Sequence, residues 1–211
     1  LLLGVRAVFA YMYLLMPKYW LRVIGDDARM GTLQAVNPIL IIIGLIVLIP
    51  VLHRFNVYKM LVYGAMISGL SLFALVFPSH GNQTYLYSLL CLTILSIGEL
   101  IWSPRLNEYT AAIAPAGQEG TYLGLSLVPW FVAKTGVSAL SGYMLDRFCP
   151  EQYQGAPLRE QLAAGNVPFW NSPSAMWLIL AVPAILGPII ALALRGWFTK
   201  GARWDTHAAA H

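Results

Sequence analysis

The feature that most constrains this chain is an apolar run from position 30 to position 52 that contains no charged side chain. A helix needs about 20 mostly apolar residues to cross the hydrocarbon core of a bilayer, and about 17 is the lower limit. Similar runs recur along the rest of the sequence, at about residues 1–17, 60–77, 85–113, 120–144 and 173–194. The sequence therefore predicts an all-α membrane protein, with six transmembrane helices forming one bundle over residues 1–211.

The composition indicates an integral, multi-pass membrane protein. Hydrophobic residues make up 58% of the chain and charged residues only 10%, whereas a soluble domain carries about 25% charged residues. The net charge of +4 comes from cations that are scattered singly along the chain, which argues against a nucleic-acid partner. Both a plasma membrane and an organellar membrane are compatible with this composition. Because the chain begins inside an apolar run, we expect it to be part of a longer protein.

The linkers divide the six predicted helices into two sets of three. Residues 53–59 form a short basic linker, residues 78–84 a short turn, and residues 146–172 the longest connection. This order is compatible with the inverted three-plus-three repeat of many secondary transporters. Basic residues are slightly more numerous on the side of the 53–59 linker, so the positive-inside rule predicts that this side is cytoplasmic. The 146–172 connection and Asn82, which begins a glycosylation sequon, are then expected on the opposite side.

Charged residues inside the predicted helices are the strongest functional candidates. Glu99 and Lys134 lie at matched depths, each about 21 Å from the cytoplasmic end of its helix. A charge at the bilayer centre costs about 2.5–3.5 kcal/mol, so such residues are usually functional or paired. We expect Glu99 and Lys134 to contact each other in the interior, either as a substrate or proton site or as a structural ion pair. Arg105 and Glu108 are spaced as a surface pair, and Arg6 is expected to snorkel to a membrane face.

Proline, glycine and tryptophan residues carry weaker signals. Pro38, after Asn37, either opens a helix or, if the helix begins earlier, frees a backbone carbonyl beside a cavity. Gly120 and Gly124 form a G-x-x-x-G pattern that favours close helix packing. Most tryptophans lie near predicted helix ends and are expected to be interfacial anchors, at positions 20, 102, 170, 177, 197 and 204.

Enzyme chemistry is not indicated. The sequence contains no G-x-S-x-G, no phosphate-binding loop, no H-E-x-x-H and no C-x-x-C. Its histidines lie in predicted loops or in the tail, so haem ligation between helices is not expected. We therefore predict no catalytic residue, no metal and no cofactor.

Four stretches carry recognisable motifs, namely residues 34–41 (QAVNPILI), 52–69, 98–104 (GELIWSP) and 130–142 (WFVAKTGVSALSG). The first resembles the Q-x-x-N-P-x-L-I opening of the eighth helix in proton-dependent oligopeptide transporters of the major facilitator superfamily. The third resembles that family's tenth-helix G-E-L-x-x-S-P, and the fourth its eleventh-helix W-F-L-x-x-x-x-G-N-x-x-x-G. Residues 52–69 resemble a degraded form of the superfamily's loop motif. The resemblance covers about residues 30–145 and implies the carboxyl-terminal six-helix bundle of a twelve-helix transporter, without its amino-terminal half.

The resemblance also implies a set of substrate-binding residues. Glu99 matches a tenth-helix glutamate that faces the peptide amino group, and Asn37 matches an eighth-helix asparagine near the site. Trp130 and Phe131 match aromatic residues that line the cavity. Lys134 departs from the pattern, because the family usually has a small or hydroxyl residue there, and its predicted depth beside Glu99 adds it to the candidate set.

The expected function is secondary active transport of a small solute by alternating access. A peptide or an amino-acid-like compound is the substrate that the resemblance implies, and coupling to protons stays open, because the family's E-x-x-E-R motif lies on a helix that this chain lacks. The rival expectation is a non-transporting membrane subunit or scaffold, in which Lys134 neutralises Glu99. The expected partners are the solute, protons, the lipid bilayer, and either the amino-terminal six-helix half or other membrane subunits.

Overall fold

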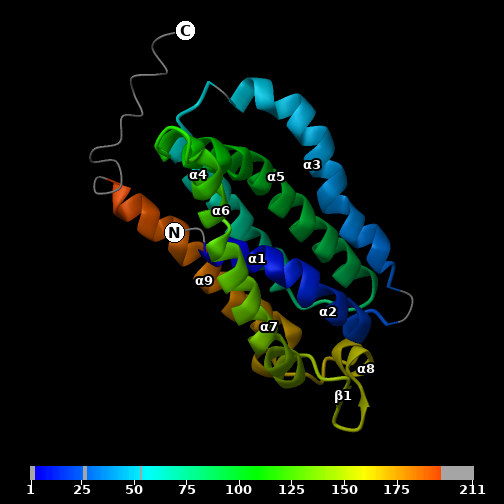
Figure 1. The fold of residues 1–211 in the computed structure, drawn as a ribbon. Helices are drawn as coiled ribbons and strands as arrows, with labels where there is room; N and C mark the ends of the chain where they lie inside the picture. The colour runs from blue at the N-terminus through cyan, green and yellow to red at the C-terminus, as the bar shows by residue number, and fades with distance from the viewer. Residues whose placement is uncertain (1–2, 26–27, 53, 196–211) are drawn as a thin grey trace.

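The apolar runs form long helices in the computed structural model of the chain, which describes residues 3–25, 28–52 and 54–195 (Figure 1). Most of the described residues are helical, and strand structure within these ranges is limited to one small hairpin. The coarse prediction of an all-α protein with long apolar helices is therefore confirmed. Two of the expected interfacial tryptophans, Trp197 and Trp204, lie outside the described residues.

Four of the predicted spans correspond to continuous helical segments. The 30–52 run has the predicted ends, whereas the third helix begins slightly before position 60, because the side chain of Asn56 caps it. The carboxamide oxygen of Asn56 accepts a hydrogen bond from the Lys59 amide at 3.1 Å, as N-cap residues do. The segments are α3 (Met30–Leu52), α4 (Val57–Leu70) with the 3-10 turn η1 (Ser71–Leu75), α5 (Asn82–Ile113) and α9 (Pro173–Ala193).

The two remaining spans are each interrupted near a proline. Pro17 and Pro129 both lie in the first turn of a new helix, where proline is tolerated because the missing N–H group has no intrahelical partner there. The interruptions divide these spans into α1 (Leu3–Leu14) and α2 (Met16–Val23), and into α6 (Glu119–Leu125) and α7 (Val128–Phe148).

Five helical stretches within the described part of the chain are long and apolar enough to cross a membrane. They are Met30–Leu48, Val57–Leu75, Asn82–Ala111, Glu119–Phe148 and Pro173–Ala193, whereas Leu3–Leu14 is apolar but shorter. These stretches indicate a multi-pass membrane protein. The remaining predicted span, at residues 1–17, begins in α1, which is too short by itself to cross a membrane. The helical path of this segment continues into α2.

The connection after α7 is ordered around a tight hairpin. Gln154 and Gly155 have φ angles of 52° and 83°, which is the backbone conformation of a two-residue turn between short strands. Leu158 of the following helix is fully buried in the core of the bundle. The connection thus has no core of its own, as expected, but it is anchored to the bundle. Its elements are β1 (Gln152–Tyr153), β2 (Ala156–Pro157), α8 (Leu158–Ala163) and η2 (Phe169–Asn171).

Small residues bring α4 and α5 into backbone contact. A Cβ atom added at Gly98 would lie 2.6 Å from the Ser68 backbone nitrogen and 2.7 Å from the Gly64 carbonyl oxygen. One added at Gly64 would lie 2.8 Å from the Trp102 nitrogen. Without a hydrophobic driving force between helices in lipid, close backbone approach at small residues is a main source of association. At these glycines α4 and α5 therefore lie so close that an added side chain would meet the backbone of the neighbouring helix.

Three tryptophans that were predicted as interfacial anchors are instead buried. The Trp20 indole N–H donates to Ser88 Oγ at 2.8 Å, and that of Trp102 donates to Ser68 Oγ at 3.2 Å. Trp177 is fully buried, with its ring edge-on to another aromatic ring. Depth along a helix does not determine which side of the helix a residue occupies, so the prediction was wrong for these three.

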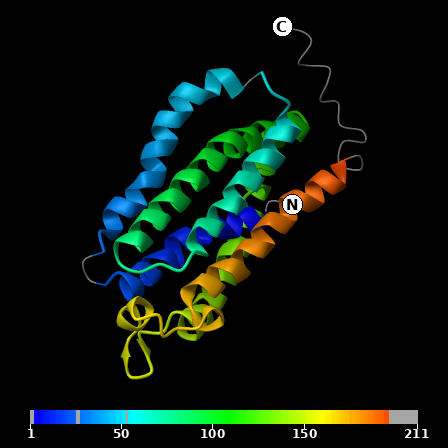
Figure 2. The same ribbon diagram turned by 180° about the vertical axis from the view of Figure 1, so that it is seen from behind.

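The two ends of the bundle are distinct (Figures 1 and 2). At one end, the Tyr58 hydroxyl donates to the Ala191 carbonyl at 2.6 Å, which joins the start of α4 to the last turns of α9. At the other end, Arg22 Nη1 donates to the Cys149 carbonyl at 2.7 Å, which joins α2 to the end of α7. We call the first the tail end and the second, which carries residues 149–172, the hairpin end.

The outer side of α3 is an unbroken apolar stripe. Its side chains lie at helical spacing and are between 52% and 75% exposed. In water such a stripe would be unfavourable, whereas in a bilayer it is the expected lipid-facing surface. The residues of the stripe are Ile39, Ile42, Ile43, Ile46 and Val47.

Candidate functional site

Glu99 is the centre of a polar cluster between α1, α3 and α5. It lies in the middle of α5, at least about 20 Å of helical rise from either end of that helix. The Asn37 side-chain amide donates to Glu99 Oε2 at 2.9 Å and to Ser96 Oγ at 3.1 Å. Ser96 in turn donates to the Leu92 carbonyl within α5. The carboxylate is therefore held by a buried amide that is itself fixed by its neighbours.

The local sequence of α3 explains why Asn37 reaches α5. Pro38 lies inside α3 rather than at its start, so of the two alternatives the helix-opening one is wrong. A proline within a helix leaves the carbonyl four residues earlier without its amide partner, and that carbonyl belongs to Gln34. Asn37 itself is only 5% exposed, and its donor group is directed at the α5 residues named above.

Arg6 of α1 is the third member of the cluster. Its guanidinium interacts electrostatically with the Glu99 carboxylate and lies over the Trp102 ring, 5.2 Å from the centroid. Tyr13, two turns later on α1, is also within electrostatic range of Glu99. The interpretation of Arg6 as a snorkelling residue was wrong. The signal was present, because a single charge in an apolar helix is by default paired or functional.

The predicted contact between Glu99 and Lys134 is not found. Lys134 is exposed on α7, and the ion pairs of the described residues do not include it. The prediction used equal depth along the two helices, and depth alone does not determine the direction in which each side chain leaves its helix. Arg6, on a helix that contacts both α7 and α9, supplies an opposite charge at longer range, since the ion pairs within 4 Å among the described residues do not join it to Glu99.

The aromatic candidates of α7 are also separate from Glu99. Phe131 is 61% exposed, and Trp130 is partly buried against the hydrophobic core. No hydrogen bond or ring contact within the described ranges joins either of them to the cluster around Glu99. Of the five predicted site residues, the structure thus brings together Glu99 and Asn37 and leaves Trp130, Phe131 and Lys134 on another helix.

Arg105 and Glu108 pair one turn apart on α5 as predicted, but the prediction that they form a surface pair was wrong. Arg105 is almost fully buried, whereas Glu108 is about half exposed. The pair lies two turns from Glu99, towards the tail end. It is a local pair within one helix, and we assign it a structural role.

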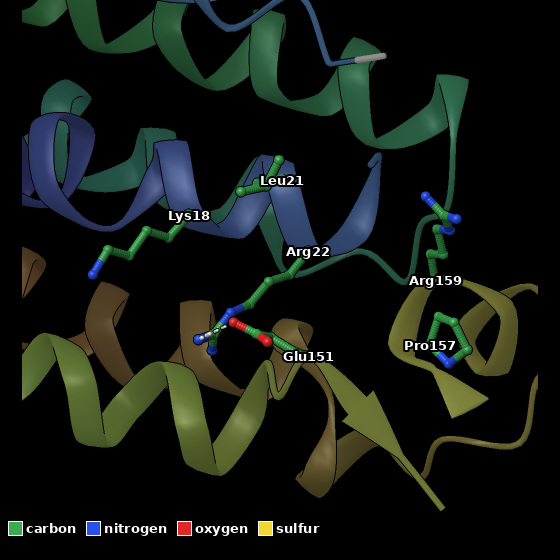
Figure 3. Close-up of a pocket in the computed structure, with 6 residues that line it drawn as sticks. All are labelled: Lys18, Leu21, Arg22, Glu151, Pro157 and Arg159. Carbon is green, nitrogen blue, oxygen red and sulfur yellow. Dashed lines mark ion pairs between the residues drawn. The ribbon is translucent and has the colours of Figure 1, made fainter. Parts of the chain in front are cut away.

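Two clefts of the described chain lie at the hairpin end. One of about 350 Å³ is lined by charged residues of α2 and the hairpin region (Figure 3). Another, of about 470 Å³, lies between residues 78–83 and residues 162–174. Glu99 lines neither cleft, and the described residues contain no group of His, Cys, Asp and Glu that could hold a metal ion.

No protein-family model matches the chain, and neither does any curated protein or solved structure with which it was compared. The cluster of Arg6, Asn37 and Glu99 is therefore the feature with the clearest bearing on function. It combines a carboxylate in the middle of a helix long enough to cross a membrane, a cation and a neutral hydrogen-bond donor, contributed by three different helices. Such an arrangement can receive a proton or a cationic group at Glu99 while Arg6 changes its pairing.

Proposed function

We propose that the chain is the carboxyl-terminal six-helix half of a secondary transporter of the major facilitator type. The observation that carries the proposal is the Arg6–Asn37–Glu99 cluster at mid-membrane depth. Ionisable residues at this depth are expensive, and where they occur they usually mark substrate or proton pathways. The resemblance of residues 34–41 and 98–104 to oligopeptide transporters points to the same three-helix region.

In the proposed mechanism, Glu99 is the group that distinguishes the loaded from the empty transporter. The carboxylate binds an ammonium group of a small peptide or amino-acid-like solute, or a proton that travels with it. Asn37 keeps the carboxylate in one orientation, since its amide is already bonded to Ser96. A ligand shifts the equilibrium between two conformations only by its difference in affinity for them. The charge of Glu99 supplies that difference.

The exposed side of α7 supports a substrate path between this bundle and a second one. Phe131, Lys134 and Ser138 are three and four residues apart, so they lie on one side of the helix, and all three are exposed. A lysine facing hydrocarbon is unfavourable, whereas a lysine facing an aqueous path between two halves is not. The proposal therefore places the amino-terminal half against this side of α7.

The test is solute uptake by proteoliposomes that contain the complete transporter, meaning this bundle with its amino-terminal half. Glu99→Gln keeps the size and hydrogen bonding of the side chain and removes its charge, so uptake should be abolished. Glu160→Gln is the matched control, because Glu160 is an exposed carboxylate on α8, remote from the cluster. Uptake at the wild-type rate by Glu99→Gln would contradict the proposed role of this residue.

A second candidate function, a non-transporting membrane subunit, is favoured by one observation. Arg6 supplies a positive charge to Glu99 within the bundle, so the cluster is complete as a structural pair without any ligand. If this candidate is correct, the wild-type protein transports no peptide, amino acid, sugar or organic acid. The variant Arg6→Gln/Glu99→Gln would then still assemble with the partner subunits.

A further inference from the structure

A charged cleft of about 350 Å³ lies at the hairpin end, between α2 and the hairpin region (Figure 3). Three cations and one carboxylate contribute to its walls. This cleft is distant from the Glu99 cluster, and nothing in the proposed transport mechanism uses it. The lining residues are Lys18, Leu21, Arg22, Glu151, Pro157 and Arg159.

Arg22 is already engaged within the protein. Its side chain is 17% exposed, it donates to the Cys149 carbonyl at 2.7 Å, and it lies 3.5 Å from carboxylate oxygens of both Asp146 and Glu151. Figure 3 shows its guanidinium directed at Glu151. Arg22 is therefore a structural residue that joins α2 to α7 and the hairpin, and its charge is largely compensated.

Lys18 and Arg159 carry the charge that is available to a ligand. Both are exposed, and the ion pairs of the described residues include neither. In Figure 3 they lie on opposite sides of Arg22. Among the described residues, the cleft thus presents two cations outside any ion pair, one on each side of an arginine whose charge is largely compensated, and this favours an anion larger than a single simple ion.

The position of the cleft identifies the kind of anion. α2 continues the first apolar helical segment to its hairpin end, where a membrane protein meets the headgroup region of the bilayer. Leu21 lines the same cleft and is 44% exposed, so the site has an apolar side as well as its cations. Lysine and arginine side chains at this level form charge-assisted hydrogen bonds to lipid phosphates on either side of a membrane, and a soluble anion would leave Leu21 in water.

We propose that the cleft of Lys18, Arg22 and Arg159 binds the phosphate headgroup of an anionic phospholipid at the hairpin end of the bundle. Lys18 and Arg159 bind the headgroup oxygens, and the exposed Leu21 contacts the lipid near its glycerol. This inference depends only on the chain lying in a membrane, so it is independent of whether the protein transports a solute.

The experiment measures lipid binding to the full chain in a mild detergent, by native mass spectrometry after removal of co-purified lipid. Dioleoyl phosphatidylglycerol and dioleoyl phosphatidylcholine are titrated in parallel. We expect phosphatidylglycerol to bind the wild type about tenfold more tightly than phosphatidylcholine, because each cation near the headgroups adds a favourable electrostatic contribution. Equal binding of the two lipids would overturn the proposal.

A matched pair of variants separates this cleft from the general charge of the surface. Lys18→Gln/Arg159→Gln should abolish the preference for phosphatidylglycerol. Arg29→Gln/Arg147→Gln removes the same charge from exposed residues at the hairpin end that do not line the cleft, and should preserve the preference. Equal loss in both double variants would show diffuse attraction to the surface and would contradict a specific site.

Two further measurements keep the outcome clear. Lys18→Arg/Arg159→Lys retains both charges and should retain the preference for phosphatidylglycerol. A loss of the preference here would mean that folding rather than charge recognition had been disturbed, and it would overturn the proposal.

Glycerol 3-phosphate carries the same phosphate without acyl chains. We expect it to compete only at concentrations about a hundredfold higher or more, because each buried methylene adds about 0.8 kcal/mol to lipid binding. Competition at equal concentration would identify a soluble anion as the ligand.

Discussion

At the scale of single residues, Glu99 lies in the middle of α5, where a neutral donor and a cation can both interact with it. Asn37 is bonded to Glu99 directly, while Arg6 interacts with it through charge and rests on the Trp102 ring. Both charged side chains are partly buried, so removal of one leaves the other without its opposite charge in a poorly solvated place. The pair can therefore be tested by asking whether its members act independently.

Arg6 and Glu99 are expected to be energetically coupled, and Lys134 and Glu99 are not. In a double-mutant cycle on the stability of the protein in detergent, Arg6→Met and Glu99→Gln should show a coupling of about 0.5–3 kcal/mol. A value in the lower half of this range is expected because Arg6 is partly exposed. Lys134→Met with Glu99→Gln should instead be additive within about 0.5 kcal/mol. The reverse pattern would restore the pairing that the sequence predicted.

The sequence predicted Glu99 and Asn37 as residues of the site, but it did not predict which cation lies near Glu99. Glu99 is recognisable because any carboxylate in an apolar helix is conspicuous, and Asn37 because of the motif around Pro38. Lys134 was preferred to Arg6 on depth alone. Depth follows from counting residues, whereas pairing also requires the rotation of each helix about its axis, which depends on long-range packing. The contact between α1 and α5 supplies that information only in three dimensions.

The thiol of Cys149 is expected to be inert in the folded protein. Burial raises the pKa of this thiol to about 12, and the nearby Arg22 guanidinium lowers it only in part. The thiolate is the reactive form, and at pH 8 it is then a very small fraction. A maleimide should leave Cys149 unlabelled until sodium dodecyl sulfate is added, whereas a cysteine introduced at the exposed Gln152 should react at once. Equal labelling rates would show that the end of α7 opens readily.

At the scale of helices, runs without charge were sufficient to locate the elements, and local chemistry decided their ends. The 30–52 run became one helix with the predicted ends, because neither of its internal prolines interrupts it. Pro17 and Pro129 instead mark new first turns. The sequence did not distinguish these two outcomes, since a proline can lie inside a membrane helix when its surroundings satisfy the freed backbone group. The presence of a helix can thus be predicted from the local sequence. Whether the helix continues past a proline also depends on the surroundings of that proline in the folded bundle.

Replacing a glycine by alanine should lower the stability of the bundle only where that glycine lies against the backbone of another helix. Gly98→Ala places a methyl group against the backbone of α4, so the bundle should lose stability by several kcal/mol or fail to fold. Gly124→Ala is the control, because nothing lies within 4 Å of a Cβ atom added there. The G-x-x-x-G pattern of residues 120–124 therefore makes no close contact within the described bundle. A measured loss for Gly124→Ala alone, in thermal unfolding in detergent, would contradict this reading.

If a second six-helix half covers the exposed surface of α6 and α7, Gly124 would lie at the contact between the two halves, and its replacement would test that contact. Gly124→Ala should then weaken assembly of the complete protein while the isolated bundle keeps its stability. Co-purification of the two halves from detergent is the measurement, with Ser138→Ala as a second change on the exposed side of α7. No effect of either change on assembly would place the contact elsewhere on the bundle.

At the scale of the whole molecule, the bundle has a polar hairpin end and an opposite end at which α3, α5 and α9 finish (Figures 1 and 2). Residues 78–83 share a cleft with α8, so the start of α5 at Asn82 belongs to the hairpin end, as the alternation of spans predicted. The basic linker before α4 lies at the other end. Which end faces the cytoplasm is decided by the charges of both ends, and the excess on the tail end is small.

Arg54 and Arg147 should therefore be accessible from opposite sides of the membrane. Both side chains are exposed. Arg54 shortly precedes α4, which starts at the tail end, and Arg147 lies in the last turn of α7, at the hairpin end. In sealed vesicles of known orientation, an impermeant maleimide should label only one of Arg54→Cys and Arg147→Cys, and detergent permeabilisation should make both reactive. The native cysteines can stay in place, because Cys91 and Cys149 are both fully buried. The positive-inside rule predicts that Arg54→Cys reacts from the cytoplasmic side. Labelling of both positions from one side would mean an even number of crossings between them, and would overturn the alternating arrangement from which the site, the lipid cleft and the proposed second half are all placed.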